Sequence, residues 1–392
     1  MKNKQKTVLI PSMLDFHFPL LQYAFCSKKY NAVILGDMEN IVETGLFYAH
    51  NDLCYPCVLI IGQMINALKS EKYDLKNTIL LIPQAGDACR GSNYIHMIRN
   101  ALKKAGYSDI PIISLNFKGL EGENQFSVNP LMVMKAVAAI MYSDILMILK
   151  NQIKPYENNI GETKKYVDKW TNILENQIKS GKKLSYILIK RNLKRISEEF
   201  KNIKQIEKCT NKIGIVGELY IKYCKLGNSN LENYLREENC EYMVNGFSWY
   251  ILYYIDTHLT EESKAMGLLF RIALKYLSGL QKSVVMNLRN NGFRCISEYK
   301  SFKNEAKGKV SFGLKVADGW LISCEVINLI KEGYNKILCV QPFGCMPNHI
   351  CGKGMYANLQ RQFPDVNIVS VDYDSSGSEI NIHNRIKMLI DI

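Results

Sequence analysis

Three cysteines in this 392-residue chain lie in loops whose residue types suit metal ligation. The apolar run at 337–340 predicts a short buried strand, which Pro342, Gly344 and Pro347 then end. Proline fixes φ and glycine allows close backbone approach, so Cys345 is held in a rigid loop. A thiol held in this way suits metal ligation better than core filling. A tight turn with an incidental cysteine is the alternative.

The same arrangement occurs around Cys89. The apolar run at 79–83 predicts a strand, and Gly86 and Gly91 stand on either side of the cysteine, with the cationic Arg90 next to it. A predicted helix at 93–105 follows. A strand end, small residues, a cysteine and a helix thus occur twice, which is more specific than either loop alone.

Cys54 lies just before a predicted apolar helix at 58–68. The N–H groups and dipole of a helix N-terminus favour a thiolate or an anionic cluster there. The Cys-x-x-Cys spacing of Cys54 and Cys57 is also found in thioredoxin-like redox motifs, but here it does not follow the first strand of a short chain. With Cys89 and Cys345, Cys54 makes three thiolates that one fold could bring together.

The elements that must position these loops alternate between strand and helix. Strands are predicted at 6–10, 31–35, 79–83, 110–115, 212–218, 337–340 and 366–374. This alternation predicts an α/β protein with two Rossmann- or flavodoxin-like, doubly wound parallel sheets and a helical insertion. In such sheets ligands bind at the carboxyl ends of strands, where the cysteine loops fall.

The pattern changes in the middle of the chain, where apolar residues recur at helical spacing and glycine is nearly absent. We therefore expect an N-terminal α/β domain over 1–149 with the Cys54 and Cys89 loops. Next we expect a helical connector over 150–208. A second α/β domain follows over 209–392 and contains the Cys345 loop.

The net charge of +13 does not predict a nucleic-acid interface. Its lysines concentrate at 150–208 and alternate with apolar residues, as on the solvated face of helices. Attraction to an anionic small molecule or an acidic partner protein stays open. The chain has no Gly-x-x-x-x-Gly-Lys-Ser/Thr run, and Gly214 and Gly217 lack the third glycine of a dinucleotide fingerprint.

Composition favours a cytoplasmic protein with reduced thiols. Twelve cysteines without a secretory signal argue against a disulfide framework. The most membrane-like run, 131–149, contains Lys135 and Asp144 and fits a buried helix better. Five single cysteines are expected to fill the core: Cys26, Cys209, Cys224, Cys240 and Cys295.

Two aspartates, Asp372 and Asp374, end the last predicted strand. They could serve a substrate or a partner. A structural role before the terminal helix is the favoured interpretation, because carboxylates at such a position usually bond the following turn.

The cysteine loops belong to a wider set of motifs, which runs from near the first strand to the last helix. It comprises Asn51-Asp52-Leu53-Cys54-Tyr55-Pro56, Gly62-Gln63, Cys89-Arg90-Gly91-Ser92-Asn93-Tyr94, Pro111-Ile112-Ile113-Ser114-Leu115-Asn116, Pro155-Tyr156-Glu157, Gly214-Ile215-Val216-Gly217-Glu218, Gln341-Pro342-Phe343-Gly344-Cys345-Met346-Pro347-Asn348-His349 and Val371-Asp372-Tyr373-Asp374. This combination resembles the 2-hydroxyacyl-CoA dehydratase superfamily, most of all its activase-associated, double-cubane-related branch.

The resemblance implies an oxygen-sensitive iron–sulfur protein that takes low-potential electrons from a separate ATP-hydrolysing activase. The electrons would drive a reductive or radical dehydration of a small molecule such as an acyl-CoA. It also implies that Cys54, Cys89 and Cys345 hold a [4Fe-4S] cluster, which leaves one iron open. A double-cubane cluster is a variant that needs more thiolates. Cys57 and Cys351 depart from the family pattern and stay open as further ligands.

Two alternatives differ in class. The chain could be a non-catalytic accessory or electron-relay subunit with a structural iron–sulfur site. It could also hold structural zinc at Cys54, Cys57, Cys89 and Cys345, although zinc favours paired Cys-x-x-Cys ligands on both sides. For the leading hypothesis and for both alternatives we expect neither a nucleic-acid nor a membrane partner. The sequence does not decide between a monomer and a dimer.

Overall fold

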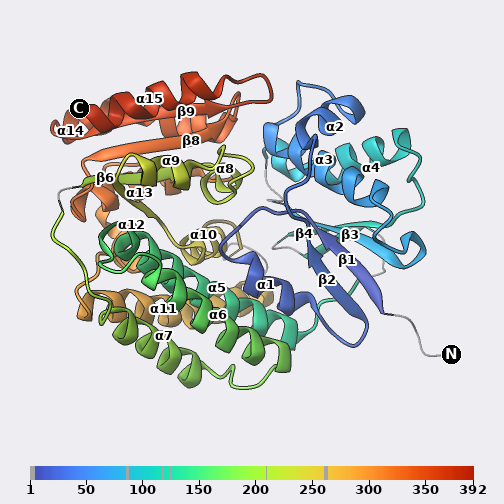
Figure 1. The fold of residues 1–392 in the computed structure, drawn as a ribbon, viewed down its shortest axis with the longest axis horizontal. Coiled ribbons are helices and arrows are strands. Elements are labelled where there is room, and N and C mark those ends of the chain that lie inside the picture. The colour runs from blue at the N-terminus through green and yellow to red at the C-terminus, as the bar shows by residue number, and fades with distance from the viewer. Residues whose placement is uncertain (1–4, 85–87, 117–118, 123–125, 209, 260–263) are drawn as a thin grey trace.

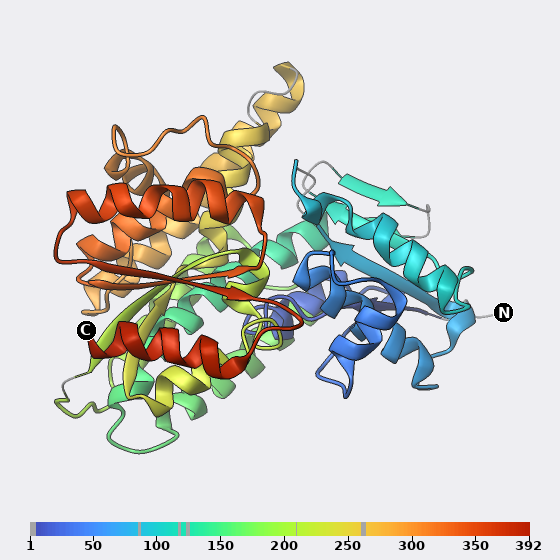
Figure 2. The same cartoon turned by 90° about the horizontal axis from the view of Figure 1, so that it is seen from above.

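Two β-sheets, each flanked by helices, lie side by side in the computed structural model (Figures 1 and 2). The structure describes residues 5–84, 88–116, 119–122, 126–208, 210–259 and 264–392. The predicted core filler Cys209 and part of the loop before Cys89, residues 85–87, lie outside these ranges.

The first sheet has the strand order β2-β1-β3-β4-β5. Its strands are β1 (Lys6–Ile10), β2 (Tyr30–Ile34), β3 (Thr78–Pro83), β4 (Ile112–Asn116) and β5 (Gly119–Gly122). The first four are parallel, and β5 pairs antiparallel with β4 at the edge. The sequence did not predict β5.

The second sheet has the order β7-β6-β8-β9 and is parallel throughout. Its strands are β6 (Asn211–Gly217), β7 (Cys240–Val244), β8 (Lys336–Pro342) and β9 (Asn367–Tyr373). The sequence analysis did not predict β7. Both sheets share the order 2-1-3-4, which confirms the predicted doubly wound, flavodoxin-like α/β fold.

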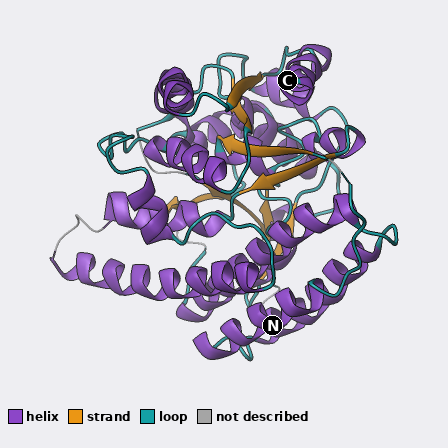
Figure 3. Cartoon of the chain, turned by 90° about the vertical axis from the view of Figure 1, so that its left-hand side faces the viewer, coloured by secondary structure: helices purple, strands orange, loops and turns teal. Residues whose placement is uncertain are grey.

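Helices cover both sheets, and the strands lie in the interior (Figure 3). Those of the first half are α1 (Phe18–Phe25), α2 (Ile41–Tyr48), α3 (Tyr55–Lys69) and α4 (Tyr94–Lys104). The middle of the chain forms α5 (Pro130–Ile153), α6 (Glu162–Ser180) and α7 (Tyr186–Phe200). The rest are α8 (Leu219–Tyr223), α9 (Leu231–Glu237), α10 (Phe247–Tyr254), α11 (Lys264–Asn290), α12 (Tyr299–Glu305), α13 (Gly319–Lys331), α14 (Gly354–Gln362) and α15 (Glu379–Asp391).

Helix α5 joins the two halves. It contacts α1 of the first half, α10, α11 and β7 of the second, and α6 and α7 of the middle segment. The stretch Pro130–Tyr156 is long and apolar enough to cross a membrane, but 72% of its apolar window is buried inside the protein. This burial confirms the sequence-based interpretation of a core helix.

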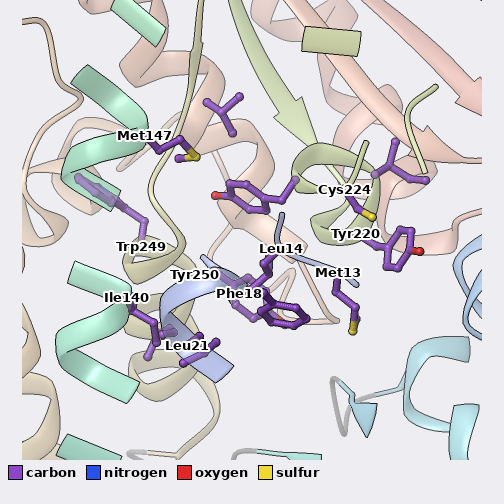
Figure 4. Packing of buried hydrophobic residues seen from close by; sticks show 14 of the residues in the cluster. Met13, Leu14, Phe18, Leu21, Ile140, Met147, Tyr220, Cys224, Trp249 and Tyr250 are labelled. Carbon is purple, nitrogen blue, oxygen red and sulfur yellow. The ribbon is translucent and has the colours of Figure 1, made fainter. Parts of the chain in front are cut away.

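The two halves share one hydrophobic core (Figure 4). Phe18 and Leu21 of α1, Ile140 and Met147 of α5, and Trp249 of α10 all belong to it. The neighbouring aromatic residues Tyr250, Tyr253 and Tyr254 are buried in the core as well. Burial of large apolar side chains from both halves stabilises their relative placement.

A buried carboxylate reinforces this junction. Asp144 of α5 is fully buried, and its two oxygens accept hydrogen bonds from the backbone N–H groups of Phe247 (2.7 Å) and Ser248 (3.0 Å), at the start of α10. Nε2 of His17, in the loop before α1, lies 2.8 Å from the same carboxylate. At Gly246 a Cβ would stand only 2.6 Å from the Asp144 carboxyl carbon, so glycine permits the approach.

We expect Asp144→Ala to lower the free energy of unfolding by about 3–5 kcal/mol, because it leaves buried N–H groups and His17 without their charged partner. Chemical denaturation measures this change. Asp168→Ala is the control, since Asp168 forms an exposed ion pair with Lys164 and its loss should cost about 0.5 kcal/mol. Equal losses in the two variants would contradict the role assigned to Asp144.

Candidate metal centre

The three predicted ligand cysteines lie on loops that the two halves of the protein contribute. Cys54 directly precedes α3, and Cys89 follows the carboxyl end of β3, a strand of the first sheet. Cys345 follows β8 of the second sheet. All three side chains are half-buried, free thiols. The loops thus occupy the positions that the sequence analysis predicted for them.

The two cysteine loops of the first half are tied to each other. Arg90, next to Cys89, donates a hydrogen bond from Nη1 to the carbonyl oxygen of Asp52 (3.1 Å). The Cys54 and Cys89 side chains are also close enough to interact electrostatically. This contact brings together cysteines that are 35 positions apart in the sequence.

Glu218 links these loops to the third. It follows β6, and its backbone N–H donates to the carbonyl oxygen of Val340 in β8 (2.9 Å). Gly217 makes this approach possible, because its φ is +128° and a Cβ there would lie 2.0 Å from the Val340 carbonyl oxygen. The Glu218 carboxylate is within electrostatic reach of Cys54, Cys89 and Cys345 alike.

Burial and negative charge keep the three thiols protonated. Burial raises the pKa of Cys54 to about 12 and that of Cys89 to about 11, and it also raises the pKa of Cys345. The carboxylate of Glu218 raises all three pKa values further. A bound metal group would replace these protons, because metal ligation deprotonates a thiol.

Each of the three sulfurs also has a hydrogen-bond donor that favours its thiolate form and lowers its pKa. The donors are the Tyr94 hydroxyl for Cys54, the Gly91 N–H for Cys89 (3.2 Å) and the Asn348 side-chain amide for Cys345 (3.3 Å). Hydrogen bonds to ligand sulfurs are one of the means by which proteins set the potential of an iron–sulfur cluster. The donor set therefore fits such a group.

The arrangement does not form a site for a single metal ion. No three cysteine, histidine or carboxylate side chains among the residues that the structure describes are placed to hold one. Tetrahedral zinc, with Zn–S bonds of about 2.3 Å, would need its four sulfurs within about 4 Å of each other. A cubane binds its thiolates through different iron atoms, so its ligands are spaced more widely.

The two further candidate ligands are more deeply buried. Cys57 lies in the first turn of α3 with 1% of its surface exposed, and Cys54 raises its already high pKa. Cys351 is 4% exposed, and its pKa is raised by burial and by Asp318. Cys57 belongs to the hydrophobic core, and both side chains are less accessible than the three half-buried cysteines.

Sequence reasoning missed the acidic surroundings of the centre. Asp318, fully enclosed at the start of α13, is within electrostatic reach of Cys89 and Cys345 and accepts a hydrogen bond from Asn348 (3.3 Å). Burial, together with the nearby carboxyl group of Glu218, raises the pKa of Asp318 to about 8. The only sequence signal was the position of Glu218 directly after a predicted strand.

The aspartates at the end of β9 have structural roles, as the favoured interpretation predicted. Asp372 accepts a hydrogen bond from the Gln341 side-chain amide (2.6 Å) and forms an ion pair with Lys353 (2.7 Å). Asp374 accepts a hydrogen bond from the Ser375 N–H (2.7 Å). Both carboxylates are thus bonded locally.

No protein-family model and no curated protein matches this chain. The interpretation of the centre therefore depends on its residues and their geometry.

The buried carboxyl of Asp318 predicts a pH-dependent stability. In the folded chain it stays protonated up to about pH 8, whereas an unfolded aspartate ionises near 3.8. Between these values the unfolded chain binds fewer protons, so this group makes the free energy of unfolding fall as the pH rises. Asp318→Asn should therefore show a smaller fall between pH 5 and pH 7.5 in denaturant titrations.

Asp365→Asn is the matched control, because Asp365 is exposed. This variant should keep the pH dependence of the unaltered chain. An unchanged slope in the Asp318→Asn variant would contradict the assignment.

Proposed function

We propose that the chain is an iron–sulfur protein of the 2-hydroxyacyl-CoA dehydratase type. It receives low-potential electrons from a separate ATP-dependent activase and uses them for a reductive or radical dehydration. One observation carries the proposal: Cys54, Cys89 and Cys345 come from loops of two different halves, yet all three lie within electrostatic reach of Glu218. A shared ligand would account for this convergence.

The roles of the residues follow from their contacts. A [4Fe-4S] cluster bound by Cys54, Cys89 and Cys345 supplies one-electron chemistry at low potential and an open iron position. Burial of the three sulfurs excludes water, and their hydrogen-bond donors stabilise the thiolate charge. Asp318 keeps its proton at neutral pH because burial raises its pKa to about 8, so it adds no second negative charge beside Glu218.

The remaining parts of the reaction come from partners. The sequence has no P-loop run, so ATP hydrolysis belongs to the activase. The substrate in this proposal is a small molecule such as an acyl-CoA, and the protein acts in the cytoplasm. None of the described cysteines is paired in a disulfide, which agrees with that compartment.

An accessory or electron-relay subunit is the second candidate function. Two cavities, of about 520 and 700 Å³, are lined by residues other than the three cysteines. A relay needs no substrate cavity beside its cluster. The placement of these two cavities away from the cysteines favours the relay over the enzyme. A substrate cavity that opens at the cysteines when the activase binds would reverse this preference.

The first test is metal content. Protein purified without air should contain iron and acid-labile sulfide and show visible absorption that bleaches with dithionite. Cys89→Ala and Cys345→Ala should each lose most of the iron and the absorption, since each removes one of three ligands.

Cys26→Ala is the matched control, because Cys26 is also a half-buried free thiol but lies after α1, where its sulfur accepts a hydrogen bond from the Ala32 N–H (3.4 Å). It should keep the iron of the unaltered chain. Protein that stays free of iron after anaerobic reconstitution, or that contains zinc in its place, would overturn the proposal. ATP-dependent reduction by an activase without turnover of added acyl-CoA would select the relay function.

A further inference from the structure

The smaller cavity, of about 520 Å³, opens between the helical middle of the chain and the second sheet. We name it the basic cavity. Its wall is formed by the end of α5, the segment after α7, the first residues of β6 and the turn after α11. Part of the net charge of +13 thus lies at a defined concave place and not only on convex helix faces.

Cationic side chains dominate the lining of the basic cavity. Lys201, Lys208, Lys212 and Arg294 line it, with Glu207 as the acid among its lining residues. A concave surface with one sign of charge focuses the electrostatic potential and concentrates counter-ions. The cavity therefore attracts anions.

Part of this charge is already compensated, and part is not. The Arg294 guanidinium is paired with the buried carboxylate of Glu241, and Lys208 donates from Nζ to Oδ1 of Asn239 (2.6 Å), which is neutral. Within the described ranges, Lys201 and Lys212 have no ion-pair partner. Lys201, Lys208 and Lys212 thus outnumber Glu207, the one acid in the lining, so the cavity keeps an excess of positive charge.

The floor of the cavity is fixed by hydrogen bonds. The side-chain amide of Gln152 in α5 accepts a hydrogen bond from the backbone N–H of Arg294 (2.9 Å). It also donates one to the backbone carbonyl oxygen of Arg294 (2.8 Å). Glu241 also accepts a hydrogen bond from the Tyr156 hydroxyl (2.7 Å). Binding at a rigid floor loses little conformational freedom.

The wall beside the floor is fixed as well. The Ile206 N–H donates to the Tyr156 carbonyl oxygen (2.8 Å), and Gln205 forms an isolated β-bridge with Glu157. The segment that carries Glu207 and Lys208 is therefore anchored to the end of the helical middle. The site is largely formed before any ligand binds.

Size and chemistry together define the ligand class. Lysine side chains bind phosphate groups as point charges, and uncompensated lysines suit a phosphate. A free phosphate ion would fill only a small part of about 520 Å³, a volume within the usual range for organic ligands. Phe293 and Ile206 add apolar surface to the lining. We propose that the basic cavity binds a phosphate-bearing organic molecule of about the size of a mononucleotide.

This site is separate from the cysteine centre. Thr210 and Lys212 stand at the start of β6, whereas Glu218 follows its end. A strand of seven residues spans about 20 Å, so a ligand in the cavity does not reach the cysteines. The inference is therefore independent of the proposed iron–sulfur function.

Calorimetric titration of the full-length, anaerobically purified chain tests the site. The probes are AMP, inorganic phosphate and adenosine at low ionic strength. We expect AMP to bind more tightly than phosphate, adenosine to give no measurable heat, and added salt to weaken AMP binding. In the Lys201→Ala/Lys212→Ala double variant the dissociation constant for AMP should rise about tenfold or more, a change of about 1.4 kcal/mol.

The control is the Lys165→Ala/Lys190→Ala double variant. It removes the same charge from exposed positions on α6 and α7, outside the cavity lining. Circular dichroism and iron content should match the unaltered chain in both double variants. Equal weakening in the two double variants, equal binding of AMP and adenosine, or no AMP binding at millimolar concentration by the folded chain would each overturn the proposal.

Discussion

The contact between Asp144 and the start of α10 is the constraint on which the candidate centre depends. The three cysteines come from two sheets, so their separation is set by how the halves are held together. Asp144 on the bridging helix α5 bonds the α10 backbone of one half and His17 of the other. Apolar packing alone is non-directional, whereas this buried carboxylate requires one orientation of its partners. The contact therefore fixes the orientation of the two halves relative to each other.

The centre gathers several buried acidic side chains. Glu218 and Asp318 lie near the thiols, and a little further away Glu325 is paired with Lys222 (2.9 Å) and accepts a hydrogen bond from Asn245 (3.2 Å). Without a cation this arrangement is costly, because like charges in a poorly solvated place raise one another's pKa. A [4Fe-4S]²⁺ core bound by three thiolates is net negative, so the neutral form of Asp318 would limit the repulsion that this proposed group meets.

Much of the fold was readable from the sequence, and the missed elements have physical reasons. Strands β1, β3 and β8 are apolar runs because parallel strands are covered on both faces. Strand β7 was not predicted because Glu241, its second residue, interrupts the apolar run. Its charge is balanced by Arg294, 53 positions later in the chain, a pairing that only the folded structure reveals. Strand β5 consists of Gly119–Gly122 and has no apolar run at all.

The candidate centre was predictable in part. Glycines and prolines around Cys89 and Cys345 indicated rigid loops, and parallel topology then placed both at strand carboxyl ends. The hydrogen-bond donors Tyr94 and Asn348 are part of the Cys89 and Cys345 motifs, but their contacts with sulfur depend on side-chain packing. Asp318 gave no signal, because nothing in its neighbourhood reveals that it becomes buried. Local sequence thus fixes the position of a thiol in a loop, and tertiary packing determines its environment.

The strand order of the second sheet has a consequence for synthesis of the protein. Strand β6 pairs with β8, which begins more than a hundred residues later, while the first sheet uses residues up to 122 only. A growing chain can therefore complete its first sheet long before the second, and long-range pairing is slow to form. For that period Cys54 and Cys89 are translated but Cys345 is not. Loading of the proposed shared group must then wait until the chain has been synthesised beyond Cys345.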